Sequence, residues 1–275
     1  MMRSLYSAIS GLKNHQVKMD VIGNNIANVN TTGYKKSRVT FSTMLSQTLQ
    51  GASSAGATLG GTNPMQVGLG ASLRSIDQIM TQGSMQSTGK PEDLMIQGEG
   101  FFVLTTNGTD RLYTRSGAFS KDSAGNLVEP ASGAKVVAAN NTGTIKIDPD
   151  VYTSFTVDKT GVITGIKKDG TSEKITDMNI QIATFPNPAG LMNQGGSFYV
   201  ESNNSGTVKR YGEGATDGSY PAGTKLISNT VEMSNVDLSE EFTDMITAQR
   251  GFQANSRVIT VSDTLLQELI DLKRG

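Results

Sequence analysis

The sequence contains no cysteine, no tryptophan and a single histidine, His15, among its 275 residues. Without cysteine the chain cannot form disulfides or bind a metal ion through thiolates. His15 falls within an apolar helical repeat, so we expect it to pack between helices rather than to serve as a general base. Neither a nucleophilic triad nor a standard zinc site is therefore expected. The sequence predicts no metal and no cofactor.

Charge is also scarce. Charged residues make up 18% of the chain, and the net charge is −1. No basic block interleaves with aromatic residues, so no nucleic-acid partner is expected. No apolar run approaches the roughly 18 residues of a membrane-spanning helix, so no membrane insertion is expected. Residues 1–20 lack the continuous apolar core of a secretory signal peptide. We therefore expect any export to proceed without a cleaved signal.

Proline is absent from both ends of the chain, because its seven copies all lie between positions 64 and 221. Since proline disrupts helix interiors, both ends are free to form long helices. The middle contains short runs typical of strands, such as "FFVLTT", "SFTVD" and "GVITGIKK", and the turn dipeptide Asp169-Gly170. Residues 50–70 are rich in Gly, Ser and Thr, and are expected to have little structure of their own.

These features predict an α+β fold with long N- and C-terminal helices paired as a coiled coil and a central all-β domain. We expect residues 1–35 and 234–275 to form the terminal-helix domain. Residues 36–70 are expected to form a connector, and residues 71–233 a β-rich outer domain. Asp237, followed by Glu240, is the expected N-cap of the C-terminal helix.

Both ends carry apolar residues at alternating spacings of three and four, which is typical of a packed helix seam. The predicted seam residues are Leu5, Leu12, Met19, Ile22, Ile26, Leu238, Phe242, Met245, Phe252, Ile259, Leu266 and Ile270. The two helices could pack on each other within one chain, or between subunits. We favour packing between subunits, because such long helices expose more apolar surface than a single partner of unequal length covers.

The N-terminal seam ends in the unusual stretch "DVIGNNIANVNTTGYKKS", Asp20–Ser37. Asn24, Asn25 and Asn28 lie near the expected helix end, and Gly33 lies beyond it. Asparagine amides can cap the last helical carbonyls or adopt a left-handed conformation, and glycine suits a position past the end. An ordinary helix stop explains Gly33 but not the run of asparagines.

Four blocks, in order, resemble those of the bacterial flagellar rod and hook proteins: "MDVIGNNIANVNTTGYKKS", "LMIQGEGFFVL", "YTRSGAFSKDSAGNLV" and "SNVDLSEEFTDMITAQRGFQANSRVITVSDTLLQELIDLKR". The resemblance implies a structural protein without enzymatic activity, whose terminal helices stack with those of other subunits as the inner tube of a hollow shaft. Asn24, Asn25, Asn28 and Gly33 would mark the turn where the chain leaves that tube for the outer domain.

The resemblance also implies partners and a location. The chain is expected to polymerise with itself, and to contact adjacent rod proteins, hook–filament junction proteins and the hook cap during assembly. It would pass unfolded through the flagellar export apparatus and reside in the flagellum, outside the cell.

Within the family, "SNVDLSEEF" and "LLQELIDLKR" resemble the hook subunits most, especially the short hooks of Gram-positive bacteria. This favours a flexible tube that acts as a universal joint and passes torque to the filament. Residues 47–68 depart from enteric hooks and resemble an insert in the distal rod subunit, so a rigid drive shaft is the alternative. A secreted flagellum-associated hydrolase is a remote alternative, because Asp and Glu are plentiful.

Overall fold

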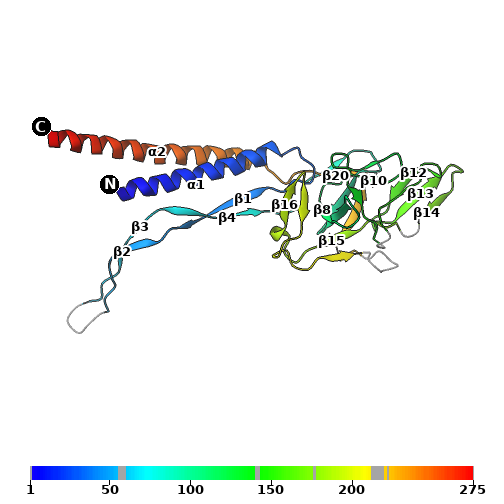
Figure 1. Ribbon diagram of the computed structural model, residues 1–275, viewed down its shortest axis with the longest axis horizontal. Helices are drawn as coiled ribbons and strands as arrows, with labels where there is room; N and C mark the ends of the chain where they lie inside the picture. The colour runs from blue at the N-terminus through cyan, green and yellow to red at the C-terminus, as the bar shows by residue number, and fades with distance from the viewer. Residues whose placement is uncertain are drawn as a thin grey trace. The chain divides into compact units, whose positions relative to one another are not determined.

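The computed structural model describes residues 2–54, 60–139, 143–175, 178–211, 220–221 and 223–274. These residues form two long helices, one short 3-10 helix and twenty short strands (Figure 1). They divide into two compact units. Unit 1 contains residues 1–27, 37–78 and 237–275, and unit 2 contains residues 28–36 and 79–236. The α+β fold class expected from the sequence is confirmed.

Unit 1 contains both long helices, α1 (Met2–Ala27) and α2 (Leu238–Arg274). Each occupies one of the proline-free ends, as the sequence predicted. Asp237 is the N-cap of α2, because its Oδ1 accepts hydrogen bonds from the backbone N–H groups of Ser239 at 2.8 Å and Glu240 at 3.4 Å.

The two helices run antiparallel and close together. A Cβ added to Gly11 would lie 2.6 Å from Nδ2 of Asn255, and one added to Gly251 would lie 2.5 Å from the ring of His15. From the first pair to the second, the residue number increases along α1 and decreases along α2, so the helices run in opposite directions. A larger residue at either position would require the facing side chain, Asn255 or His15, to shift.

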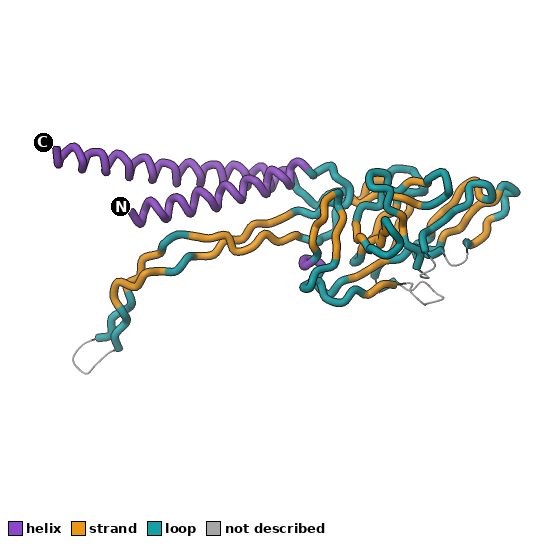
Figure 2. The backbone as a smooth tube through the Cα atoms, in the orientation of Figure 1, coloured by secondary structure: helices purple, strands orange, loops and turns teal. Residues whose placement is uncertain are grey.

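The rest of unit 1 is a pair of two-stranded antiparallel ribbons (Figure 2). Their strands are β1 (Ser37–Thr43) paired with β4 (Ala71–Gln78), and β2 (Ser46–Gln50) paired with β3 (Met65–Gly68). The segment expected to be a structureless connector is thus folded over its described part, and that expectation is wrong. Residues 55–59 of the segment lie outside the described residues.

Hydroxyl pairs between the ribbon strands explain how so polar a segment folds. Oγ1 of Thr40 lies 2.6 Å from Oγ of Ser75, and the hydroxyls of Ser53 and Thr62 are 2.8 Å apart. Together with the backbone ladder, such cross-strand pairs stabilise a ribbon that has little apolar surface to bury. Apolar alternation is limited to short stretches such as Val39–Phe41 and Met65–Leu69, so hydrophobic periodicity gave only a weak signal.

Unit 2 contains the other strands. They are β5 (Met85–Ser87), β6 (Leu94–Gln97), β7 (Phe101–Thr105), β8 (Leu112–Thr114), β9 (Ser120–Lys121), β10 (Leu127–Val128), β11 (Lys135–Val136), β12 (Tyr152–Val157), β13 (Ile163–Lys167), β14 (Ser172–Lys174), β15 (Ile182–Thr184), β16 (Met192–Gly195), β17 (Phe198–Val200), β18 (Lys209–Tyr211), β19 (Lys225–Ser228) and β20 (Thr230–Glu232), with a 3-10 turn at Pro188–Gly190.

A nine-stranded sheet organises unit 2, with the path β16-β17-β8-β7-β11-β10-β9 and β15 bridging β7 to β18. Every residue of β7 is buried, because both faces of that strand pack against apolar side chains. One face contributes Phe102 and Leu104 to the larger core, and the other contributes Phe101 and Val103 to a smaller one. This strand is the "FFVLTT" run of the sequence.

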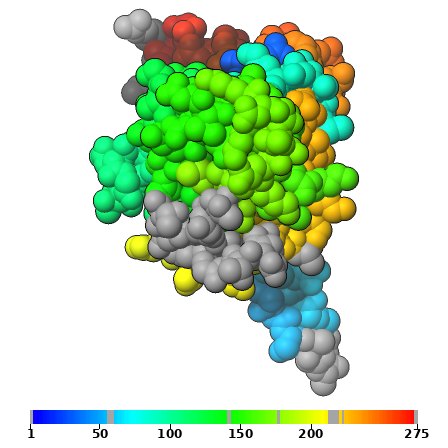
Figure 3. All heavy atoms as spheres, turned by 90° about the vertical axis from the view of Figure 1, so that its right-hand side faces the viewer, coloured from blue at the N-terminus to red at the C-terminus, as the bar shows by residue number. Residues whose placement is uncertain are grey.

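A three-stranded sheet, β12-β13-β14, lies at one face of unit 2, where its green residues form much of the surface in Figure 3. The predicted Asp169-Gly170 turn joins β13 to β14, and Gly170 has a φ of +78°. Two further pairs, β5 with β20 and β6 with β19, join the beginning of unit 2 to its end.

Candidate self-assembly surfaces

The predicted seam of α1 lies on one side of the helix. Ile22 is buried, and Leu5, Leu12, Met19 and Ile26 are half-buried. Since the residues facing α2, including Gly11 and His15, lie along the same side, this stripe packs at least partly within the chain.

On α2, four of the seven predicted seam residues are half-buried, and these are Met245, Phe252, Ile259 and Leu266. Leu238, Phe242 and Ile270 are exposed, at 39%, 50% and 58% of their surface. The buried positions between them are Glu241, Ala248 and Ser262. The buried side of α2 thus runs through these three positions and the four half-buried seam residues, whereas the other three predicted residues lie off it. A role of the exposed residues between subunits stays a prediction.

Asn25 joins three elements of unit 1. Its amide is buried, donates to the carbonyl of Ser37 at 2.9 Å and accepts from the Ser37 N–H at 3.0 Å. The same Nδ2 lies 3.2 Å from Oε2 of Glu241 in the first turn of α2. The end of α1, the start of β1 and the start of α2 are therefore held by one side chain. These contacts give Asn25 a role in joining the three elements.

The other predicted turn residues differ in their surroundings. Asn24 is exposed, and Oδ1 of Asn28 accepts a hydrogen bond from the Thr31 hydroxyl at 3.1 Å. Gly33 has a φ of +68°, and a Cβ there would lie 2.4 Å from the backbone nitrogen of Ser116. Glycine is thus required at residue 33 both by conformation and by space.

A buried charged cluster lies immediately after this turn, in unit 2. Nζ of Lys35 lies 2.5 Å from Oε1 of Glu232 and 2.8 Å from the carbonyl oxygen of Thr81. The other carboxylate oxygen of Glu232 lies 3.3 Å from Nη1 of Arg115. Oε1 of Glu232 also accepts the backbone N–H of Gly83 at 2.9 Å. One carboxylate therefore joins residues from four distant parts of the chain.

Burial lowers the pKa of Lys35 and of Arg115, and the adjacent carboxylate of Glu232 opposes that shift in both. Arg115 is further held by the carbonyl oxygen of Gly98 at 2.7 Å and by the ring of Phe101, whose centroid lies 5.5 Å from its guanidinium carbon. A cluster so enclosed fixes the geometry of the chain beyond the turn.

The sequence analysis missed all three charged residues. Charged residues in a sequence ordinarily indicate surface, and Lys35 lies 197 positions from Glu232. For two of the three, a signal was available in their position inside the motif blocks, since Lys35 falls in "TTGYKKS" and Arg115 in "YTRSGAFS".

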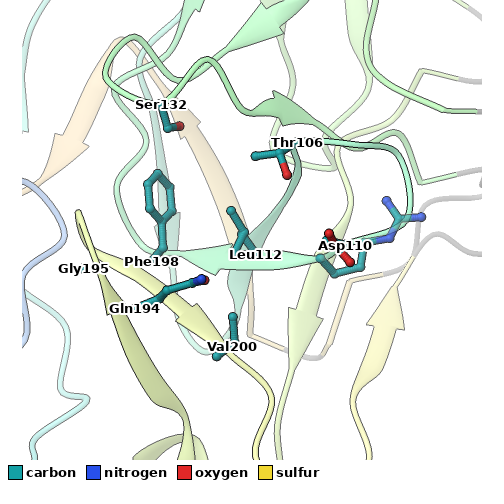
Figure 4. A pocket seen from close by; sticks show the side chains of 9 residues that line it. Thr106, Asp110, Leu112, Ser132, Gln194, Gly195, Phe198 and Val200 are labelled. Atoms are coloured by element: carbon teal, nitrogen blue, oxygen red, sulfur yellow. The ribbon is translucent and has the colours of Figure 1, made fainter.

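Unit 2 also contains a hollow of about 560 Å³, shown in Figure 4. Leu112, Phe198 and Val200 form its apolar part, with Asp110 at one side, and Arg111 also lines it. In the described part of the chain, no group of three or more His, Cys, Asp or Glu residues could hold a metal ion. None of the described helices is long and apolar enough to cross a membrane.

Three family models match the chain in order. The flagella basal body rod protein model matches residues 5–35, the flagellar hook protein FlgE/F/G D1 domain model matches residues 95–165, and the flagellar basal body rod FlgEFG protein C-terminal model matches residues 227–272. The first and third contain α1 with its turn and most of α2. The second contains the buried strand β7 and Arg115.

The chain is also similar to full-length proteins of known class. It is 50% identical over 277 residues to the flagellar basal-body rod protein FlgG of Bacillus subtilis, covering 100% of both chains. It is 37% identical to the FlgG protein of Borreliella burgdorferi, again covering 100% of both. It is 32% identical to the flagellar hook protein FlgE of the same organism, covering 99% of this chain and 100% of that protein. From these matches, the chain belongs to the family of flagellar rod and hook proteins, the structural subunits of the flagellar axis.

Proposed function

We propose that this chain is a subunit of the flagellar rod, in its distal part, and that it polymerises into a rigid hollow drive shaft. The observation that carries the proposal is the end-to-end match with rod proteins of almost the same length. The alignment with the hook protein of Borreliella burgdorferi extends over 449 positions, whereas this chain has 275 residues. That hook protein therefore contains long insertions that this chain lacks.

The hook interpretation favoured by the sequence is thus less well supported than its alternative. It rested on short similarities in the C-terminal helix, and α2 is common to both classes. Residues 47–68, whose resemblance to an insert in the distal rod subunit pointed to the rod, contain most of β2 and all of β3. Leu45, Leu49 and Met65 are 87%, 56% and 56% exposed. Such apolar side chains on an ordered ribbon support a role in bracing neighbouring subunits.

In this proposal the chain has a mechanical and not an enzymatic role. The exposed seam residues of α2 pack against other subunits, and the buried cluster around Glu232 keeps the path of the chain fixed under load. Adjacent rod subunits are the principal partners. Export occurs through the flagellar channel, and contacts with the hook cap or the hook–filament junction apply only if the chain serves in the hook.

Complementation tests the proposal. The chain would be expressed in two Bacillus subtilis strains, one lacking its own FlgG and the other lacking its hook protein. We expect motility and completed rods in the first strain only. Rescue of the hook mutant alone would favour the hook, and failure of both, with the chain exported, would remove support for either role.

A further inference from the structure

Unit 1 contains an apolar groove beside the N-terminal half of α1. Tyr6 and Ile9 of α1 form one wall, and Met44 and Leu69, at the junction of the two ribbons, form the other. Arg3 and Lys13 also line it. The groove has a volume of about 400 Å³, and its four apolar side chains are 64%, 39%, 43% and 37% exposed in the order given. We call it the α1 groove.

The junction of the ribbons is built to approach α1 closely. Gly70 has a φ of +124°, and a Cβ there would lie 2.2 Å from Oγ of Ser10. The backbone N–H of Met44 donates to the carbonyl of Gly70 at 2.9 Å, which fixes the wall of the groove against the helix. The α1 groove is therefore a preformed feature of unit 1.

Within the described residues, the C-terminal end of α2 extends beyond the part of the helix that faces α1. Gly11 faces Asn255, and His15 faces Gly251. In an antiparallel pair the numbers of facing residues have a constant sum, which here is 266. The first residue of α1, Met2, therefore lies opposite residue 264. α2 continues for ten residues more, to Arg274, and Figure 1 shows it extending past the N-terminal end of α1.

This overhang carries an exposed apolar stripe made of Leu265, Leu269 and Leu272. The three residues are 45%, 51% and 78% exposed. Their spacing is i, i+4 and i+7, which is the spacing of anchors when a helix lies in a groove. The stripe spans about 10 Å along the helix axis, whereas Arg3 and Lys13 of the α1 groove are about 15 Å apart along theirs. The stripe thus fits between the two cations.

The charges that border the groove and the stripe are complementary. Residues 1–19 contain three Lys or Arg residues and no Asp or Glu. Residues 263–272, which include the stripe, contain three Asp or Glu residues, and Lys273 and Arg274 lie beyond the stripe at the end of α2. Glu268 lies one turn from both Leu265 and Leu272, so it borders the stripe. Placed in the groove, it would lie between Arg3 and Lys13.

We propose that the α1 groove of one subunit receives the C-terminal stripe of a second copy of the chain. The overhang cannot reach the groove of its own chain, because it points away from the N-terminal end of α1. This contact rests on the proposed function, because it requires the chain to associate with itself. It also gives the apolar overhang a cover that a single chain does not supply.

Disulfide cross-linking tests this contact, and because the chain contains no cysteine, only the introduced cysteines can form a disulfide. A Leu69→Cys chain would be mixed with a Leu269→Cys chain under assembly conditions and oxidised mildly. The matched control is Gln267→Cys, which is exposed at the same level of α2 but on its other side. Because a disulfide needs Cα atoms within about 7 Å, we expect roughly tenfold more heterodimer from the first pair than from the control.

Charge reversal supplies a second arm. Glu268→Lys in the Leu269→Cys chain should lower the heterodimer yield roughly fivefold, as expected for loss of an ion pair at a rim. Arg3→Glu with Lys13→Glu in the Leu69→Cys chain should restore it. If Glu268→Lys acted only by unfolding the overhang, the Arg3→Glu and Lys13→Glu changes would not restore the heterodimer yield.

Electron microscopy of the same samples separates this inference from the proposed function. Tubes with equal cross-linking in test and control would overturn the groove contact and leave the rod proposal standing. Specific cross-linking without tubes would support the contact and contradict the rod proposal. Predominant Leu69–Leu69 homodimers, or the absence of both tubes and cross-links, would overturn the contact.

Discussion

Lys35 and Glu232 form an ion pair of 2.5 Å in which both side chains are completely shielded from solvent. Lys35 follows the turn after α1, and Glu232 ends β20, five residues before the N-cap of α2. A neighbouring contact joins the same segments, because the Lys36 N–H donates to Oδ1 of Asn235 at 2.7 Å. The segments that leave one helix and enter the other are thus fastened to each other inside unit 2.

Replacing Glu232 by Gln should destabilise unit 2 severely. Lys35 and Arg115 would remain buried without their counter-charge, which costs about 3–5 kcal/mol. Lys35→Met should cost less, because Glu232 keeps Arg115. Urea unfolding of the full chain measures both. Lys146→Ala, which removes an exposed pair with Asp148, is the control and should leave the midpoint almost unchanged. Equal effects of all three variants would contradict a special role of the cluster.

Alkaline pH should destabilise unit 2 through its buried tyrosines. Burial raises the pKa of Tyr113 and of Tyr199 to about 12 from 10.0. Above pH 10 the unfolded chain therefore binds fewer protons than the folded chain, so stability is present below pH 10 and is lost as pH rises towards 12. Between pH 10 and pH 12, Tyr199→Phe should make the fall of the unfolding free energy with pH less steep by roughly 1.4 kcal/mol per pH unit.

The measurement is the free energy of unfolding between pH 9 and about 12. Tyr6→Phe is the control, since Tyr6 is 64% exposed in unit 1. An unchanged slope in Tyr199→Phe would show that its phenol ionises as freely in the folded chain as in the unfolded one.

Gly33→Ala should be much more damaging than Gly133→Ala. Both glycines have a φ of +68°, so the conformational strain of alanine, about 1 kcal/mol, is the same in each. Only at residue 33 would the Cβ meet backbone, at 2.4 Å from the nitrogen of Ser116, whereas nothing lies within 4 Å at residue 133. The difference between the melting temperatures of the two variants measures the effect of the clash with Ser116. Similar decreases in melting temperature would contradict that clash.

The helix glycines should respond in opposite directions. Gly23 has open space around an added Cβ, so Gly23→Ala should stabilise α1 by about 1 kcal/mol. Gly251→Ala would place its Cβ 2.5 Å from the ring of His15 and should weaken the helix pair despite the better helix propensity. Helical ellipticity during thermal unfolding distinguishes them. If both variants gained helix stability, the close packing at residue 251 would be refuted.

Deleting residues 50–63 should leave unit 2 and polymerisation intact but make the polymer more compliant or differently curved. The deletion removes the bridge between Ser53 and Thr62 and retains β1, β3 and β4. Bending stiffness and curvature in electron micrographs provide the measurement. Urea unfolding of the dispersed chain controls for the fold. Polymers of unchanged shape would leave the ribbon without a bracing role.

The sequence predicted what depends on local signals. The proline-free ends gave α1 and α2, the N-cap Asp237 gave the start of α2, and the run "FFVLTT" gave β7. Each of these elements buries apolar residues at a period that a single segment reveals.

The remaining features depend on partners that are distant in sequence or lack apolar periodicity. Every residue of β2 and of β3 is exposed, so neither strand had a buried face to detect. The buried side of α2 was predicted wrongly at Phe242, because the charged Glu241 beside it is buried instead and a charged residue gives no apolar signal. Asn25 was singled out, but its bonds to Ser37 and Glu241 require the folded chain.

The contact between Asn25 and Glu241 joins positions 216 residues apart. A ribosome adds about 5–20 residues per second, so α1 is complete roughly 10–40 s before its partner helix begins to emerge. During synthesis the apolar side of α1 is therefore presented to the cell without α2. The nascent chain meets chaperones and other hydrophobic surfaces with this helix first, and the order of translation, rather than the final contacts, determines which of them it encounters.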